Sequence, residues 1–264
     1  MNNSGNNSYL SYPLQFIAKQ LYFFFTIFFF LIVYGCEDGL LSHFHGTGEI
    51  TTEIRYIDGF NKIEIHDDIE VSIIPHSDFA GRLVLSGGEN LLPKIETSKN
   101  NSTLSIKNNN QLNWIRNYSK SNISIELHID TITNIIYSGI GNITFLDTLT
   151  IKNFTYESII GMGTVKLSLS TDSTHIILHT GSTDVFPIGK SNYSHFYQFG
   201  SGIVNGKDFE VQNQHVHNRG TNNCYTNPIS SLGVTIESSG NVFYKNNPEI
   251  LWLKITGSGE LIKY

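Results

Sequence analysis

Apolar and polar residues alternate with a period of two through short segments of this chain, which predicts strands with one buried face. Turn-forming pairs such as Asp58-Gly59 and Gly87-Gly88 separate the segments between residues 43 and 110. After the N-terminal region no segment has apolar residues at helical spacing. The apolar positions that we expect on the buried faces of the first half are Ile63, Ile65, Ile69, Val71, Ile73, Leu83, Leu85, Leu104 and Ile106.

A glycine-centred unit returns every 18 to 22 residues through the second half of the chain. The units begin at Gly139, Gly161, Gly181, Gly200, Gly220, Ser238 and Gly257. Four residues after each start is a small apolar residue, and these are Ile143, Val165, Val185, Val204, Cys224, Val242 and Leu261. A column of this kind predicts side chains that stack inside a repeating structure. The segment 46–50 (GTGEI) matches the unit, and we expect it to form an early coil.

A second column is predicted to point inward four residues before each unit. Its members are Ile135, Glu157, Ile177, Phe196, Val216, Val234 and Leu253. Glu157 does not fit an interior position, and the long spacing of 22 residues between Gly139 and Gly161 predicts a bulge or a shifted register there. The stretch 108–122 has the weakest pattern and is interpreted as a loop or an insertion.

A repeat of about 20 residues corresponds to one coil of a β-helix with three short strands. Leucine-rich repeats share this period, but their L-x-x-L-x-L core is missing, and WD40 and kelch repeats are about twice as long. We therefore predict an all-β fold, a right-handed parallel β-helix whose N-terminal half is less regular. The open end of such a solenoid needs protection, and we expect Lys263 or a partner to supply it at the last coil.

The N-terminus reads as an export signal. Residues 21–35 form an apolar run of 15 residues, whereas a membrane-spanning helix needs about 20. The sequence Val33-Tyr34-Gly35-Cys36 resembles the lipobox of bacterial lipoproteins, in which the cysteine is lipidated. We predict a lipoprotein signal peptide at 1–35, a short tether at 36–45 and the β-helix domain at 46–264. A plain signal peptide or a short anchor remains the alternative.

Composition narrows the choice of partners. The net charge is −6, the isoelectric point is near 5.9 and no cluster of Lys and Arg occurs, so a nucleic-acid partner is not expected. If Cys36 carries lipid, Cys224 has no partner for a disulfide within the chain. Because Cys224 falls in the apolar column, we interpret it as a buried structural residue, with a catalytic nucleophile as the alternative.

Three motifs carry a resemblance to a known family. They are Gly59–Ile63 (GFNKI), Asn90–Thr97 (NLLPKIET) and Ser138–Ile143 (SGIGNI). With them the chain resembles the bacterial auto-transporter adhesin, head GIN domain family. The resemblance implies a right-handed β-helix, export, frequent lipobox signals and an origin in Bacteroidetes, and it brings no catalytic residues. One departure is Asn101-Ser102, where the family often has a glycine.

Four aromatic residues form the candidate surface patch. His195 and His215 each lie five residues before a repeat unit, so they are expected to be neighbours one coil apart, about 4.8 Å between backbones. Tyr197 and His217 lie two residues further along the same faces. Three imidazoles on one face are ligands suited to Zn²⁺ or Cu²⁺. The alternative, an exposed polar ladder, is preferred, so no metal and no cofactor are predicted.

Enzymatic function is not expected. The carboxylates of the second half fall in different registers of the repeat, so no aligned pair is available for lyase or hydrolase chemistry. The glycine motifs lie between strands and do not match a nucleotide-binding loop. We predict a non-enzymatic lipoprotein of the cell envelope, in the outer membrane through lipid on Cys36, that binds a glycan or a surface protein. The alternatives are a structural envelope component without an external ligand and a carbohydrate-active enzyme.

Overall fold

The computed structural model describes Lys19, residues 47–110 and residues 123–264. Contacts divide the chain into two units, Met1–His45 and Gly46–Tyr264, and every strand lies in the second. Within the described residues, no helix has the length and apolar character needed to cross a membrane. The only helical element of the described solenoid unit is a single 3-10 turn, so the expected all-β class is confirmed.

The predicted signal peptide, the tether and the lipidated cysteine Cys36 fall outside the described residues, apart from Lys19. So does most of the stretch 108–122, of which residues 108–110 are described. These predictions therefore remain predictions.

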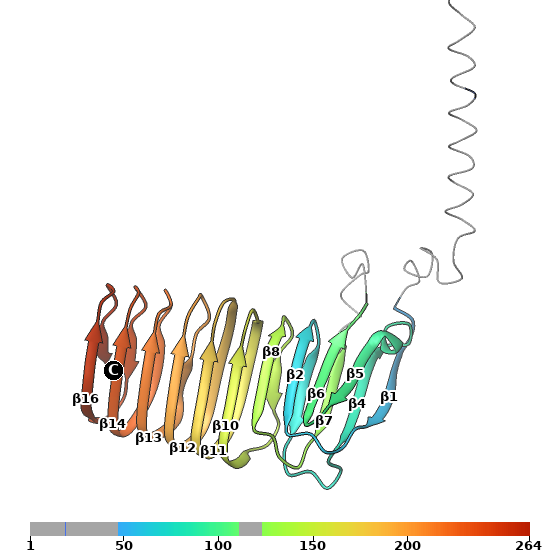
Figure 1. The fold of residues 1–264 in the computed structure, drawn as a ribbon, viewed down its shortest axis with the longest axis horizontal. Coiled ribbons are helices and arrows are strands. Elements are labelled where there is room, and N and C mark those ends of the chain that lie inside the picture. The colour runs from blue at the N-terminus through green and yellow to red at the C-terminus, as the bar shows by residue number, and fades with distance from the viewer. Residues whose placement is uncertain (1–18, 20–46, 111–122) are drawn as a thin grey trace, which may run out of the picture. The chain divides into compact units, whose positions relative to one another are not determined.

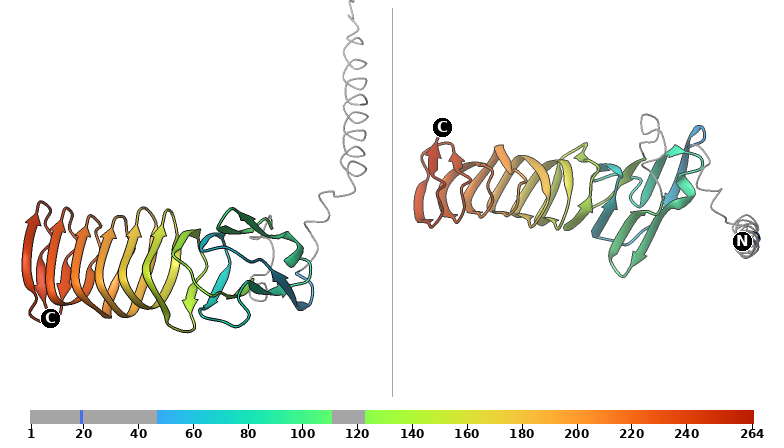
Figure 2. Two further views of the ribbon diagram at one scale, coloured as in Figure 1. Left: turned by 60° about the horizontal axis from the view of Figure 1, so that its bottom comes forward. Right: turned by 90° about the horizontal axis from the view of Figure 1, so that it is seen from above.

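From residue 134 onward the chain winds into stacked coils, seen as a row of parallel arrows in Figure 1 and as successive turns in Figure 2. Each strand pairs in parallel with a strand about one repeat later. The strands are β8 (Asn134–Gly139), β9 (Ile143–Phe145), β10 (Leu149–Ser158), β11 (Met162–Leu178), β12 (Ser182–Gln198), β13 (Asn205–Asn218), β14 (Cys224–Ile236), β15 (Val242–Tyr244), β16 (Glu249–Ile255) and β17 (Leu261–Lys263). The predicted solenoid is confirmed.

The first apolar column lies inside the solenoid, as predicted. Val165 pairs with Val185, and Val185 pairs with Val204 in the next coil. Each of these side chains, and those of Ile143, Cys224 and Val242, is completely buried, whereas Leu261 in the last coil is half-buried. Full burial of one such aliphatic side chain stabilises a fold by about 1.5–3 kcal/mol, so this column is a main source of cohesion between coils.

The second column differs from its prediction at three positions. One is Leu253, which pairs with Val234 but is 49% exposed in β16, and the other two are Glu157 and Ile177. Glu157 and Ile177 are partners of each other on the outside, while their neighbours Tyr156 and Ile176 point inward and are completely buried. The column that packs inside is Ile135, Tyr156, Ile176, Phe196 and Val216, followed by Val234. The cause at Glu157 and Ile177 is the corners between strands, which gain or lose a residue from coil to coil. Glycines in a corner therefore do not keep a constant distance from the strand before them, and no bulge interrupts the strand near Glu157.

The first half joins the same stack in a different order. Strand β2 (Lys62–Asp67) pairs in parallel with both β6 (Thr103–Asn108) and β8, and β3 (Glu70–Ile74) pairs with both β7 (Ser124–His128) and β9. In Figure 1 the cyan β2 accordingly lies between the green β6 and the yellow-green β8. The early coil is thus inserted between two coils that follow it in sequence. All nine apolar positions predicted for this half are buried.

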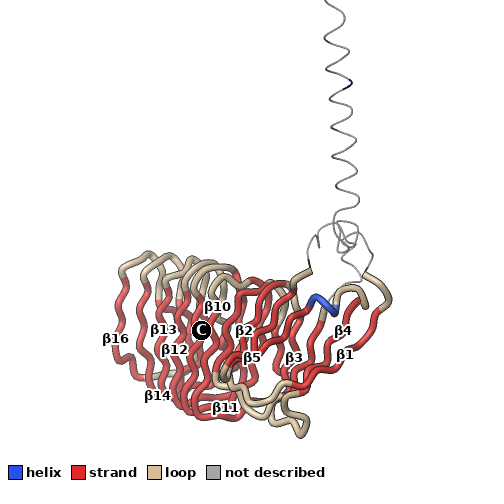
Figure 3. Tube along the Cα trace, turned by 45° about the vertical axis from the view of Figure 1, so that its right-hand side comes forward, coloured by secondary structure: helices blue, strands red, loops and turns tan. Residues whose placement is uncertain are grey.

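Antiparallel strands close this end of the solenoid (Figure 3). β1 (Ile50–Tyr56) pairs with β4 (Arg82–Gly88), β4 pairs with β7, and β5 (Ile95–Asn100) pairs with β6; the 3-10 turn η2 (Leu92–Lys94) precedes β5. The expectation that segment 46–50 forms an early coil is wrong. Ile50 opens β1, pairs with Gly88 in antiparallel register and has 64% of its surface exposed. Among the described residues, no coil lies outside β1 to bury Ile50.

At the other end of the described stack, β16 is exposed along its whole length. The expected shielding by Lys263 is not what the structure shows. The ammonium of Lys263 donates a hydrogen bond to the side chain of Asn247, one corner away, and leaves β16 uncovered among the described residues.

Candidate functional site

The four residues of the predicted surface patch lie on one outward face of the solenoid. The face consists of the C-terminal halves of β10, β11, β12 and β13 together with β14 and β16, all in parallel register. Because side chains alternate along a strand, the residues between the buried Ile176, Phe196 and Val216 point outward. One row of this face is made by successive partners, which are Thr155, His175, His195, His215, Gly233 and Trp252.

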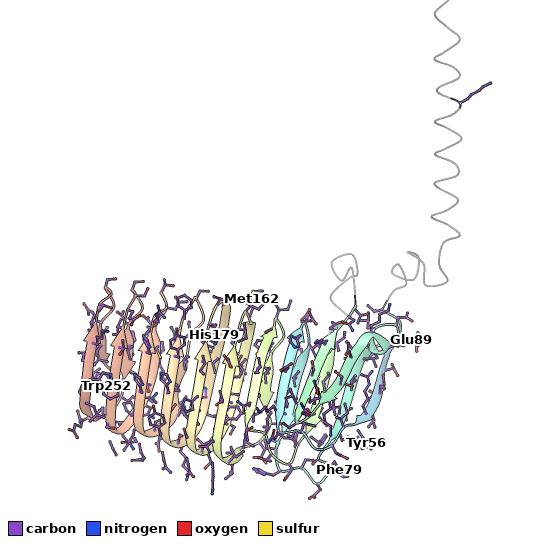
Figure 4. All side chains as sticks on the ribbon, in the orientation of Figure 1. Tyr56, Phe79, Glu89, Met162, His179 and Trp252 are labelled. Carbon is purple, nitrogen blue, oxygen red and sulfur yellow. The ribbon has the colours of Figure 1, made fainter. Side chains whose placement is uncertain are left out.

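We call His175, His195, His215 and Trp252 the imidazole row. The rings of His195 and His215 are stacked, with centroids 4.6 Å apart and planes inclined by 15°. His175 meets His195 edge to face at 6.0 Å. Trp252 meets His215 edge to face at 5.0 Å and lies at the β16 end of the row (Figure 4). Aromatic rings at such separations attract one another, so the row forms one continuous ring surface.

Glycine at position 233 makes room for the indole. A Cβ atom built on Gly233 would lie 2.2 Å from the ring of Trp252, which is closer than two carbon atoms can approach. The indole therefore occupies the space that a side chain would take in the intervening coil. The imidazole row continues across β14 for this reason.

A second row beside the first holds Tyr197 and His217, whose rings meet edge to face at 5.3 Å. Glu237 lies next to both His217 and Arg219, with its carboxylate oxygens 3.2 Å from Nε2 of His217 and 2.9 Å from Nε of Arg219. Arg219 also donates a hydrogen bond of 3.2 Å to the hydroxyl of Tyr197. The structure thus brings all four predicted residues together and adds an ion-pair cluster at their edge.

The pKa values of two imidazoles in the row, His195 and His215, are lowered. Burial lowers the pKa of His195 to about 4, and the nearby imidazoles of His215, His175 and His217 lower it further. Burial, followed by His217, also lowers the pKa of His215. Nε2 of His195 is buried and has no hydrogen-bond partner among the described residues. The stacked rings of His195 and His215 therefore favour the uncharged form at pH 7.

A metal site does not fit this arrangement. Within residues 47–110 and 123–264, no group of three or more His, Cys, Asp or Glu side chains could hold a metal ion. His195 and His215 stack through their ring faces, whereas a shared metal needs ring nitrogens that converge in the ring planes. Stacking contacts explain their proximity.

A polar groove with a volume of 530 Å³ lies where the strands of four coils bend. Lys152, Asp172, Asn192 and Gln212 line it, one from each of β10, β11, β12 and β13. Tyr193 follows Asn192 directly and packs its ring at 6.0 Å from His175. The groove and the imidazole row are therefore adjacent, with Tyr193 between them.

Sequence reasoning did not identify His175, Tyr193 or Trp252. His175 lies 20 residues before His195, so the repeat itself contained the signal. Counting from glycines concealed it, because the corner after β11 shifts His175 to six residues before Gly181. Trp252 lies five residues before Gly257, the same offset as His195 and His215 from their glycines, so the repeat also contained the signal for Trp252.

A family model agrees with this architecture. The model described as "Putative auto-transporter adhesin, head GIN domain" matches residues 59–248, which is more than half of the chain. The chain belongs to this family. The resemblance expected from the GFNKI, NLLPKIET and SGIGNI motifs is thereby confirmed. No protein with curated annotation matches the chain.

Solved structures of other bacterial proteins share the fold. A protein from Bacteroides fragilis described as a putative adhesin superposes with a TM-score of 0.74 at 20% identity, covering 82% of this chain and 97% of its own. One from Parabacteroides distasonis, described as a putative lipid binding protein, has a TM-score of 0.64 at 20% identity, with 83% and 98% covered. A putative adhesin from Parabacteroides merdae has a TM-score of 0.56 at 16% identity, again with 83% and 98% covered. At these identities the likeness concerns the fold.

Proposed function

We propose that this head GIN domain protein is a non-enzymatic, lipid-anchored protein of the cell envelope that adheres to a ligand through the face bearing the imidazole row. The observation that carries the proposal is the continuous ring surface from His175 to Trp252, stacked across five neighbouring coils. The family description as an adhesin supports it.

The chemistry of the face suits binding. Aromatic and Arg side chains contribute most of the binding energy at protein interfaces, and this face presents Tyr197, Arg219 and Trp252. Its strands are hydrogen-bonded to neighbours on both sides, except for β16 at the end of the described stack. Little conformational entropy is then lost when a partner docks, because the side chains are held by a rigid sheet.

Export and anchoring complete the proposal. The apolar run and the lipobox-like sequence before Cys36 support a lipoprotein of the outer membrane. Metabolic labelling with a palmitate analogue tests this, since wild-type protein should incorporate label and the Cys36→Ser variant should not. Proteolysis of intact cells should remove the domain if it faces outward. Full protection of the domain would favour the structural envelope component instead.

The role of this face can be tested with intact cells that display the full-length protein. The measurement is how strongly these cells adhere to immobilised glycans and matrix proteins. Tyr197→Ala combined with Trp252→Ala should reduce adhesion at least tenfold. Tyr56→Ala is the matched control, because Tyr56 is 72% exposed on β1 and lies away from the face. Equal adhesion of the wild type and the face variant would contradict the proposed site.

A further inference from the structure

We propose that the polar groove beside the imidazole row binds an uncharged oligosaccharide that lies along the solenoid axis. This inference rests on the proposed adhesive function, for which it names the ligand class. The occupant is inferred from the shape of the groove, the balance of its charges, the exposed ring at its rim and the pairing of its strands.

Each of four successive coils contributes residues to the groove. Ile151, Thr171 and Ser191 are ladder partners before the bend, and Asn153, Ser173 and Tyr193 are partners after it. The residues between these partners, Lys152, Asp172 and Asn192, have no ladder partner and line the groove together with Gln212. Successive coils are about 4.8 Å apart, so four coils offer a track about 14 Å long. Such a track suits a short oligosaccharide better than a single sugar.

The charges of the groove cancel. Lys152 and Lys190 face Asp172 and Glu210, and all four side chains are exposed. In the part of the chain that the structure describes, neither lysine forms an ion pair. Asp172 accepts a hydrogen bond from Asn192 at 3.1 Å. A lining with both donors and acceptors and no net charge matches hydroxyl groups, which both donate and accept, better than it matches a polyanion or a polycation.

Tyr193 supplies an apolar contact at the rim. Its side chain is 39% exposed, and its ring is fixed against His175 at 6.0 Å. A pyranose ring has an apolar face of C–H groups, which can pack on an aromatic ring while its hydroxyls reach the polar groove. The rim therefore fits an amphipathic sugar ring.

Peptide binding and catalytic hydrolysis at the groove both conflict with the structure. A peptide that binds by β-augmentation needs a free strand edge, but β11 and β12 are paired on both sides. Catalytic hydrolysis needs two carboxylates set across one bond. Asp172 and Glu210 come from coils two apart, and they occupy different positions of the repeat, so the groove is a binding site.

The test measures binding of full-length protein in detergent to neutral hexasaccharides (cellohexaose, xylohexaose, laminarihexaose and maltohexaose) and to an acidic hexagalacturonate. The proposal predicts saturable binding of at least one neutral hexasaccharide and at least tenfold weaker binding of the acidic one. Asn192→Ala combined with Gln212→Ala, and separately Tyr193→Ala, should each weaken neutral binding at least tenfold. Asn61→Ala combined with Tyr56→Ala is the control and should bind like the wild type, because both residues are exposed and lie outside the groove.

Lys190→Gln is a further groove variant, and its exposed side chain has no role in the core. Circular dichroism reports folding for every variant. The inference is overturned if no neutral hexasaccharide binds, if the groove variants bind like the control, or if shorter sugars are released. In one outcome, cells with the groove variants still adhere, but cells with Tyr197→Ala combined with Trp252→Ala do not. This outcome refutes the oligosaccharide groove alone and leaves the proposed function standing. Loss of adhesion in none of these variants refutes both.

Discussion

His195 and His215 lie face to face in adjacent coils, with ring centroids 4.6 Å apart. Two imidazoles this close disfavour protonation of each other, and burial acts in the same direction. The pKa of His195 is lowered to about 4 for these reasons. Ring stacking on the outside of the solenoid is therefore coupled to pH.

We predict that the protein loses stability as the pH falls from about 6.5 to about 4. In the unfolded chain His195 has its ordinary pKa near 6.5, so the unfolded state takes up the proton first. Neutral His195 thus stabilises the fold fully above pH 6.5, and this contribution is lost towards pH 4. At pH 5 the loss should be about 1 kcal/mol relative to pH 7, after allowance for partial exposure.

Urea unfolding at pH 7 and pH 5 checks this, with His195→Gln as the control. Gln cannot titrate, so the variant should lose about 1 kcal/mol less than the wild type between the two values. The same pH dependence in both proteins would show that His195 keeps an ordinary pKa.

Because adjacent coils are in close contact at Gly189, a substitution there should strongly destabilise the fold. Its backbone has φ of +103°, and a Cβ atom there would lie 2.1 Å from the carbonyl oxygen of Leu169 in the preceding coil. Gly189→Ala should destabilise the fold by about 3 kcal/mol, because the strained conformation and the backbone clash add. Gly59→Ala is the control. Gly59 also has positive φ, but the nearest atom to a Cβ there is Nζ of Lys99 at 3.3 Å, the end of a long side chain that can shift, so about 1 kcal/mol is expected. Equal losses in denaturant unfolding would contradict the close packing of the coils.

The thiol of Cys224 should be inert in the folded protein. It is completely buried in the interior column, and burial raises its pKa. In a Cys36→Ser background, a thiol reagent such as DTNB should react only in denaturant. Cys224→Val should be nearly neutral, whereas Cys224→Ser should cost about 1–3 kcal/mol by placing a hydroxyl in an apolar interior. Rapid labelling of the native protein would revive the reading of Cys224 as a reactive nucleophile.

The period of the glycine units was sufficient to predict the interior column from Ile143 to Val242. It failed at Glu157, and it missed His175, because corners of varying length separate a glycine from the strand before it. Only the backbone pairing settles which of two consecutive residues points inward. A method that aligned strands rather than corners would have found both.

Two features had no signal in the sequence. Insertion of β2 between β6 and β8 places Ile63 against Leu104 on one side and Ile135 on the other, and pairing of such remote residues leaves no periodic trace. The groove combines Lys152 and Asp172, which lie at the bend without a ladder partner, with Lys190 and Glu210, which are ladder partners of each other. Sequence reasoning could not show that these residues line one groove.

The imidazole row and the groove exist only if residues about 20 apart in sequence lie side by side. Methyl nuclear Overhauser effects in valine-labelled protein measure this most directly. The structure predicts cross-peaks that connect Val165 with Val185 and Val185 with Val204, and protection of all three from a soluble paramagnetic agent. Absence of these cross-peaks, or methyl groups of Val165 and Val185 broadened by the agent, would contradict the stacked coils and remove both binding surfaces.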